Sequence, residues 1–172
     1  MTNWSHPLIS VCLVAHATAA STNNPVSSQV FSAAAGGSGD FGKACIAAIA
    51  TLGGEHAPIA EARRAIYGQL DVYEALADGR RIPGWGNSFY RYRSDPAWDK
   101  VAKLLQMQYN EHYMLIERIT GELHSVGKML YPNAAAYTAV CSEIAGVPHG
   151  AEQAVLLIGR LPAWADLWEQ RA

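Results

Sequence analysis

The spacing of apolar residues along the chain predicts helices. Apolar side chains recur at steps of three and four residues, the period of an α-helix with one buried face. Within 41–52, for example, Ile46, Ile49 and Ala50 share a face. No segment alternates apolar and polar residues as a half-buried strand does. We therefore expect an all-α fold, a compact helical bundle, with helices over 26–35, 41–52, 58–77, 97–122, 134–145 and 150–170.

Glycine-rich and capping residues predict where these helices begin and end. Gly36-Gly37-Ser38-Gly39 separates the first two helices, and Gly53-Gly54 stops the second. Asp78-Gly79 ends the third helix, and Ser94-Asp95-Pro96 is a suitable cap for the fourth. Gly146 ends the fifth. The buried stripe of the fourth helix is expected to contain Val101, Leu104, Leu105, Tyr109 and Leu115.

Length and composition indicate one globular domain. The 172 residues are enough for a substantial core, and 50% of them are apolar while 16% are charged. We expect a single domain over 1–172, with residues 1–10 as a flexible N-terminus. A net charge of −2 gives no reason to expect nucleic acid or an anionic membrane surface as a partner.

Cysteine usage and the N-terminal segment favour a cytoplasmic protein. Cys12, Cys45 and Cys141 are widely spaced in apolar surroundings, which favours buried free thiols in a reducing compartment and no metal site. The apolar run 8–15 is similar to a signal peptide, but residues 1–7 contain no Lys or Arg. No run approaches the roughly 20 apolar residues that span a bilayer.

Three segments resemble the active-site stretches of citrate synthase and citryl-CoA lyase. They are Gly53-Gly54-Glu55-His56, Ile82-Pro83-Gly84-Trp85-Gly86-Asn87 and Leu130-Tyr131-Pro132-Asn133-Ala134-Ala135. The order and approximate separations are those of the family. Residues 13–17 and 154–164 resemble two further family motifs, so the resemblance runs from about Val11 to Glu169. It implies the C-terminal, active-site-bearing part of the citrate synthase fold, without the family's N-terminal half.

The resemblance implies two catalytic positions, His56 and Asn87. His56 matches the family's His that donates a hydrogen bond to the thioester carbonyl oxygen as the enol forms. Asn87 stands where the family has the His that polarises the ketone, and an amide donates a hydrogen bond but delivers no proton. The residues alone also fit a His held at a helix junction and an Asn that caps a turn after Gly86.

Ala135 is the largest departure from the family pattern. It stands where the family has the Asp that removes a proton from acetyl-CoA, and a methyl side chain accepts no proton. Loss of a general base typically costs about 10² to 10⁴ in rate. The carboxylates nearest these motifs in sequence are Glu55, Asp95 and Glu143. Each of them also fits a helix cap or a solvated position.

The resemblance implies a coenzyme A site that is better retained. In the family, backbone groups of the loop that corresponds to Ile82–Gly86 surround the adenine of coenzyme A, and a Lys lies near the coenzyme A phosphates. Arg80 and Arg81 add positive charge beside the loop. The residues alone also fit a tight aromatic turn and a solvated Lys. The implied coenzyme A positions are Ile82, Pro83, Gly84, Trp85, Gly86 and Lys128.

The carboxylate-binding set implied by the resemblance is depleted. Arg160 keeps one family position, while Arg91 or Arg93 lies near the place of a second Arg, and Asn133 completes the expected set. A dicarboxylate needs two or three forked donors in a dry site. We therefore do not expect oxaloacetate or citrate to bind as it does in the family.

Three functions remain open from the sequence. The first is an acyl-CoA enzyme, a C–C lyase, synthase or thioesterase that uses His56 and Asn87. The second is a catalytically inactive relative, a pseudoenzyme, that binds a CoA thioester or a small organic acid without any covalently bound cofactor. The third is a structural or assembly protein. The family resemblance implies a homodimer, and a partner chain is the other source of the missing base and Arg.

Overall fold

The computed structural model describes residues 5–20, 26–52, 58–68, 70–87, 90 and 93–170. These residues form helices joined by turns, and their single β-like pairing is an isolated bridge between Trp85 and Pro132. The all-α prediction is confirmed. The helices are α1 (Pro7–Ala20), α2 (Val26–Ser38), α3 (Phe41–Ile49), α4 (Ile59–Tyr67), α5 (Val72–Ala77), α6 (Pro96–Gln108), α7 (Asn110–Ser125), α8 (Ala134–Ile144) and α9 (Glu152–Glu169).

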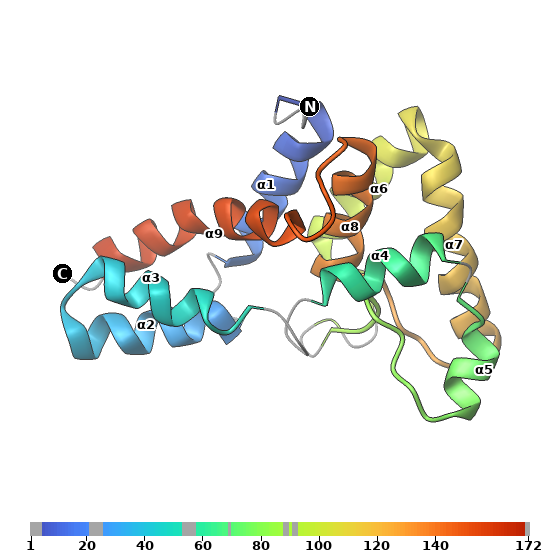
Figure 1. Ribbon diagram of the computed structural model, residues 1–172, viewed down its shortest axis with the longest axis horizontal. Coiled ribbons are helices and arrows are strands. Elements are labelled where there is room, and N and C mark those ends of the chain that lie inside the picture. The colour runs from blue at the N-terminus through green and yellow to red at the C-terminus, as the bar shows by residue number, and fades with distance from the viewer. Residues whose placement is uncertain are drawn as a thin grey trace.

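The main body is built around α8 (Figure 1). Every residue of α8 from Ala135 to Ser142 is buried, because α1, α4, α6 and α9 all pack against it. A helix that is apolar on all sides, as this one nearly is, belongs in the interior. The other helices contribute large buried side chains to the same core, including Leu8, Ile66, Leu105, Ile116, Ile119 and Leu123.

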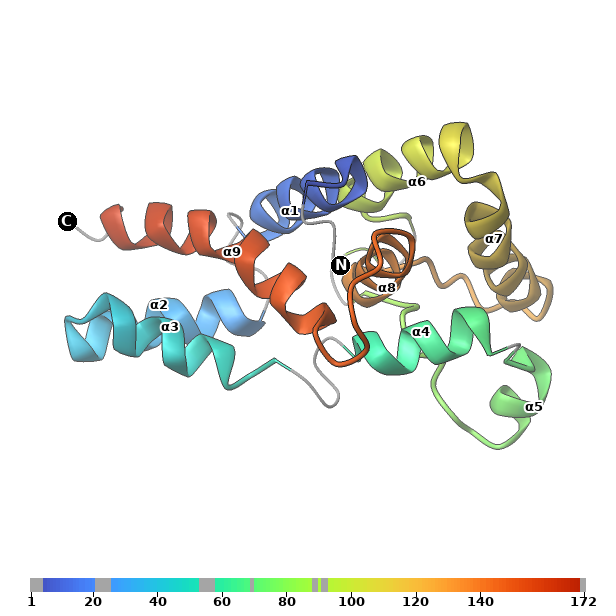
Figure 2. The same cartoon turned by 45° about the horizontal axis from the view of Figure 1, so that its top comes forward.

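An arm extends from this body and consists of α2, α3 and the C-terminal half of α9. In Figures 1 and 2 the three helices lie side by side, and the chain ends at the tip of α9. Their small core is centred on Phe31 and Trp164, whose rings stack at 5.6 Å. The face that Ile46 and Ile49 share is not buried in it, since these side chains are 68% and 38% exposed. The smaller Ala44, Cys45 and Ala48 fill the core instead.

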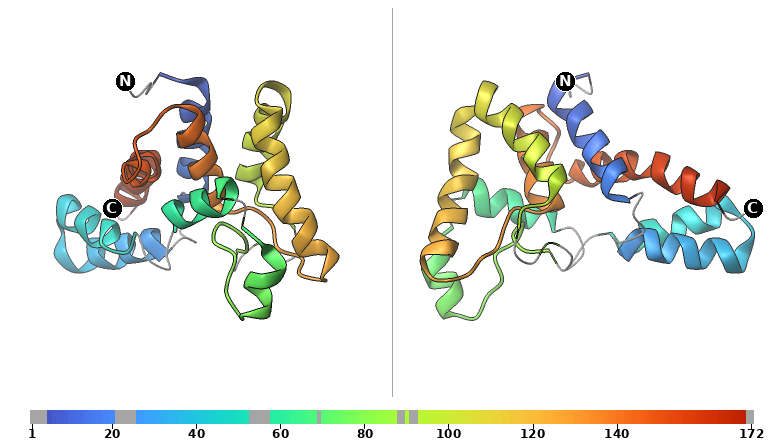
Figure 3. Two further views of the ribbon diagram at one scale, coloured as in Figure 1. Left: turned by 45° about the vertical axis from the view of Figure 1, so that its right-hand side comes forward. Right: turned by 180° about the vertical axis from the view of Figure 1, so that it is seen from behind.

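Helix α1 crosses α9 at very close range (Figure 3). Gly159 lies at the crossing, and a Cβ atom there would stand 2.6 Å from His16 Cβ and 3.0 Å from the Leu13 carbonyl oxygen. The absence of a side chain at 159 therefore allows the two backbones to meet. The crossing brings the next residue, Arg160, to the junction of body and arm.

Several predicted helix boundaries are wrong. The helix predicted over 58–77 is two helices, because α4 ends at Gly68 and the Asp71 side chain caps α5 by accepting from Glu74 N–H. The helix predicted over 97–122 breaks at Tyr109, whose backbone leaves the helical region while its hydroxyl meets His6 Nε2 at 3.3 Å. Gly36 and Gly37 continue α2 rather than ending it.

The predicted flexible N-terminus is also wrong from residue 7 onward. Residues 7–10 belong to α1, and Leu8 and Ile9 are fully buried. The apolar run over 8–15 is therefore a core helix. None of the helices within the described ranges is long and apolar enough to cross a membrane.

Candidate functional site

Two of the three singled-out segments lie together. Gly86 N–H donates to the Tyr131 carbonyl at 2.9 Å, and Asn133 N–H donates to the Gly84 carbonyl at 2.9 Å. The side chain of Asn133 adds two bonds: its amide donates to the Gly86 carbonyl at 2.8 Å, and its Oδ1 accepts from Ala135 N–H at 2.9 Å. Asn133 thus caps α8 and fixes the 82–86 loop to the start of that helix.

The loop is packed into the body through its own residues. Gly84 has φ +91, and a Cβ there would lie 3.0 Å from Ala62 Cβ and 3.1 Å from Ala136 Cβ, so only glycine fits. Trp85 is 7% exposed, and its indole Nε1 donates to Thr120 Oγ1 at 2.9 Å. Thr120 lies 35 residues away on α7, and no local sequence pattern singles it out.

These contacts limit what the loop can offer a ligand. The Gly86 N–H is already bonded within the chain, and Ile82 and Trp85 are buried side chains. Pro83, half-buried, is the loop residue that lines a surface pocket.

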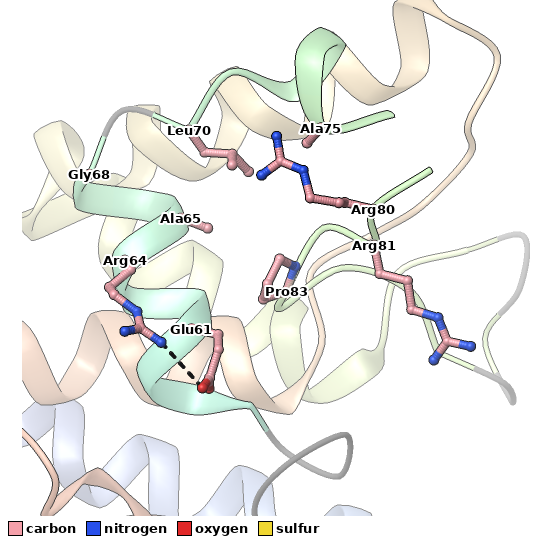
Figure 4. A pocket seen from close by; sticks show the side chains of 9 residues that line it. All are labelled: Glu61, Arg64, Ala65, Gly68, Leu70, Ala75, Arg80, Arg81 and Pro83. Atoms are coloured by element: carbon pink, nitrogen blue, oxygen red, sulfur yellow. Dashed lines mark hydrogen bonds and ion pairs between the residues drawn. The ribbon is translucent and has the colours of Figure 1, made fainter. Parts of the chain in front are cut away.

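That pocket is bordered by both basic and apolar side chains (Figure 4). Its volume is roughly 310 Å³, at the small end for ligand sites. Arg80 extends between Leu70 and Ala75, whereas Arg81 points away. Arg64 and Arg80 give the lining two cations against the single carboxylate of Glu61, so the pocket favours an anion. It is lined by Glu61, Arg64, Ala65, Gly68, Leu70, Ala75, Arg80, Arg81 and Pro83.

Ala135 lies in the first turn of α8 and is 1% exposed. Of the carboxylates considered as replacements, Glu143 is engaged in an ion pair with Arg63. Asp95 is 6% exposed, and its Oδ1 caps α6 by accepting from Ala97 N–H at 2.8 Å. Burial raises the pKa of Asp95 above its ordinary value. Glu55 lies outside the described residues.

Arg160 is a buried cation without a carboxylate partner in the described part of the chain. It is 7% exposed, and its Nη1 donates to Ser27 Oγ near the start of α2. Its Nε is buried and has no hydrogen-bond partner among the described residues, whose ion pairs do not include it. Burial lowers the pKa of Arg160, and the nearby Tyr137 opposes this shift.

A hydrogen-bond network lies beside Arg160. The Thr138 hydroxyl donates to the Ala134 carbonyl, so its oxygen accepts from His16 Nε2 at 2.7 Å. His16 Nδ1 pairs with the Tyr137 hydroxyl at 3.4 Å. These two hydrogen bonds fix the orientation of the fully buried His16 ring. The family-like motif at residues 13–17 contains His16 and was the signal that could have predicted the network.

The remaining predicted positions are dispersed. Asn87 is half-buried at the end of the loop. Lys128 is exposed in the turn after α7, where its backbone N–H donates to the Leu123 carbonyl. His56 and Arg91 lie outside the described residues. Within those described, no cluster of His, Cys, Asp and Glu could hold a metal ion.

The fold and this arrangement of loop and helix define an all-α protein of the citrate synthase type. The family model for the citrate synthase C-terminal domain matches residues 5–172, so the chain belongs to that family. A solved structure of citryl-CoA lyase from Hydrogenobacter thermophilus is similar, with a TM-score of 0.77 and 19% identity over 95% of this chain and 67% of that one. At this identity the likeness shows the fold alone. A comparison with curated proteins finds no significant match.

Proposed function

We propose that this citrate synthase-like or citryl-CoA lyase-like protein binds a small organic acid or a CoA thioester, with ordinary Claisen condensation impaired or lost. Arg160 is the observation that carries the proposal. A buried guanidinium with an unpartnered Nε is costly, and a ligand carboxylate supplies both the charge and the acceptor that it lacks.

The chemistry at the start of α8 supports loss of condensation. Ala135 leaves no proton acceptor directly after the Asn133 cap. Glu143 is paired with Arg63. Asp95, near the His16 hydrogen-bond network, is then the described carboxylate whose pKa is raised. The protein is accordingly a pseudoenzyme for condensation. An acyl-CoA enzyme using His56 and Asn87 is the alternative.

The surroundings of the loop support a coenzyme A ligand. The phosphates of coenzyme A are anionic, and the pocket beside Pro83 carries Arg64 and Arg80. In the described part of the chain, Arg64 pairs with Glu61 and Arg80 pairs with Asp78. Both ion pairs are exposed and therefore weak, so each arginine is free to exchange its carboxylate for a phosphate. Lys128 adds a solvated cation.

Melting curves with coenzyme A, acetyl-CoA and citrate at millimolar concentration test the proposal. Citrate or acetyl-CoA should raise the melting temperature of the wild type, and Arg160→Gln should abolish the citrate shift. Arg118→Gln is the matched control, because Arg118 is half-exposed on α7 and pairs with Glu122. Absence of a shift with all three ligands contradicts ligand binding and favours an assembly role.

Turnover separates an enzyme from a binder. We expect no measurable condensation of acetyl-CoA with oxaloacetate. His56→Ala should leave coenzyme A affinity unchanged if the protein only binds, and should abolish any lyase or thioesterase turnover if it is an enzyme. Ordinary citrate synthase turnover would contradict the proposal and assign a substitute base.

The arm supports a homodimer or assembly role. Helix α2 has no charged residue, and α3 carries Lys43 alone while it exposes Ile46 and Ile49. An uncharged apolar face approaches a second copy without repulsion. Sedimentation of the wild type and of Ile46→Lys tests this, with the dimer expected only in the wild type. We propose a cytoplasmic protein without nucleic-acid or membrane partners.

A further inference from the structure

Helix α1 begins with a histidine cap. His6 lies directly before the helix, and its ring Nδ1 accepts a hydrogen bond from Leu8 N–H at 3.2 Å. The His6 carbonyl accepts from Ile9 N–H at 2.9 Å, which begins the helical hydrogen bonding. A side chain that accepts from one of the first N–H groups of a helix is an N-cap, a role that Ser, Thr, Asp and Asn usually fill. Here an imidazole nitrogen fills it.

The second ring nitrogen of His6 connects this cap to the corner between α6 and α7. His6 Nε2 lies 3.3 Å from the hydroxyl of Tyr109, the residue that separates the two helices. A backbone N–H only donates, so Nδ1 must accept from Leu8 and carries no proton. In the neutral ring the proton is therefore on Nε2, which donates to the Tyr109 hydroxyl. A neutral His6 thus satisfies both contacts.

The charged neighbours of α1 offer a protonated His6 no counter-charge in the described part of the chain. Helices α6, α8 and α9 pack against α1, and α7 begins after Tyr109. The titratable side chains on α1, on these three helices and in the first turn of α7 are Cys12, His16, Asp95, Asp99, Lys100, Lys103, Glu111, His112, Tyr113, Tyr137, Cys141, Glu143, Glu152, Arg160, Asp166 and Glu169. None of them forms an ion pair with His6. The carboxylates of Glu143 and Glu152 are held by Arg63 instead.

We propose that protonation of His6 releases the start of α1, so that this end of the fold loosens in acid. A protonated ring carries an N–H on both nitrogens, and its Nδ1 proton would face Leu8 N–H. The cap is then lost, and a positive charge stands at the positive end of the helix dipole. The folded state takes up this proton less readily than the unfolded state. Stability is therefore lost as the pH falls through the range in which imidazoles titrate, about pH 6.5.

The release would act on side chains that anchor α1 in the main body. Leu8 and Ile9 are fully buried, and the cap fixes the turn that carries them. Further along the helix, Leu13 and His16 pack against α9 at the close crossing. The first turn is thus the end of α1 that can open while the crossing holds. The inference does not depend on the proposed ligand, because His6 lies outside the candidate site.

Melting temperature measured from pH 8 to pH 5 tests the switch, with His6→Asn as the matched variant. Asn is a favoured N-cap, since its side-chain oxygen can accept from Leu8 N–H, and it does not titrate. Over this range the melting temperature of the wild type should fall about 2–4 °C further than that of His6→Asn. His149→Asn is the control, because His149 is exposed in the turn before α9 and the variant should follow the wild type. An equal or smaller fall in the wild type than in His6→Asn would overturn the inference.

Nuclear magnetic resonance of the wild type tests the same idea without a variant. Spectra that correlate the ring protons with the ring nitrogens should place the proton of neutral His6 on Nε2. Exchange of the Leu8 amide proton, corrected for its intrinsic pH dependence, should become faster as His6 is protonated. A neutral ring protonated on Nδ1, or Leu8 exchange that is independent of the His6 titration, contradicts the inference. These spectra decide the matter if His6→Asn fails to fold.

Discussion

Two arginines are buried to the same degree and differ completely in what surrounds them. Arg63 is 6% exposed and Arg160 is 7% exposed. Arg63 Nε and Nη2 meet Glu143, and its Nη1 donates to Glu152 at 2.6 Å and to the Val147 carbonyl at 3.4 Å. Glu152 is further held by Gly150 N–H at 2.7 Å. This cluster joins α4, α8 and α9, and each of its charged side chains has a partner of opposite sign.

Among the described residues, Arg160 donates to one serine hydroxyl, that of Ser27, and its Nε has no hydrogen-bond partner. A buried charge that the fold itself satisfies has a structural role, whereas one that the fold leaves incomplete needs an external partner. These surroundings favour a structural role for Arg63 and agree with the binding role that we propose for Arg160.

The largest effect is expected from Arg63→Met. Removing this cation leaves Glu143 and the buried Glu152 without their partner, so we expect a loss of about 3–5 kcal/mol in the free energy of unfolding. Chemical denaturation measures it. Arg64→Met on the same helix is the control, since its exposed pair with Glu61 should contribute less than about 1 kcal/mol. Equal effects of the two variants would contradict the assignment.

Arg160→Met should have the opposite profile. The substitution leaves no described carboxylate without its partner, because none pairs with Arg160. The variant should therefore keep its free energy of unfolding within about 1 kcal/mol of the wild type, or gain stability. Ligand stabilisation should disappear instead, a loss of about 2.7 kcal/mol at a ligand concentration one hundred times Kd. Denaturation with and without citrate gives both numbers. A large loss without ligand would make Arg160 structural.

Acid should weaken the Arg63 cluster through Glu152. Burial raises the pKa of Glu152, but hydrogen bonds from the backbone and from Arg63 outweigh it and place the pKa below the ordinary 4.5. The carboxylate therefore stabilises the fold fully above pH 4.5, and this stability is lost as the pH falls through the folded-state pKa. Melting temperature against pH should fall less steeply there in Glu152→Gln than in the wild type.

Asp95 should show the smallest effect and the reverse sign. Burial raises its pKa above the ordinary 3.8, so the folded state takes up a proton more readily than the unfolded one. Its carboxylate thus costs stability at neutral pH, and the cost fades as the pH falls from the folded-state pKa toward 3.8. Asp95→Asn keeps the α6 cap, and it should equal or exceed wild-type stability at pH 7 by under about 1 kcal/mol. A clear loss would contradict this.

The sequence predicts the parts of this fold that local signals govern. Gly146 ends α8 as expected, and Asp95 caps α6. The break at Tyr109 could not be predicted, because the apolar stripe continues through it and the contact with His6 is 103 residues distant. The site likewise divides into parts that local motifs predict and parts that they do not. The 82–86 loop and Asn133 could be predicted from their motifs. The partners of Arg63 could not, because they lie 80 and 89 residues away in sequence.

The crossing at Gly159 links the position of Arg160 to the absence of a side chain at residue 159. A methyl group there would collide with the body of His16 and with the Leu13 backbone, neither of which is a flexible side-chain end. Relief would require α1 and α9 to separate, and Arg160 would move away from Ser27 with its helix. The position of the Arg160 guanidinium therefore depends on the close contact between the α1 and α9 backbones at Gly159, one residue earlier in the chain.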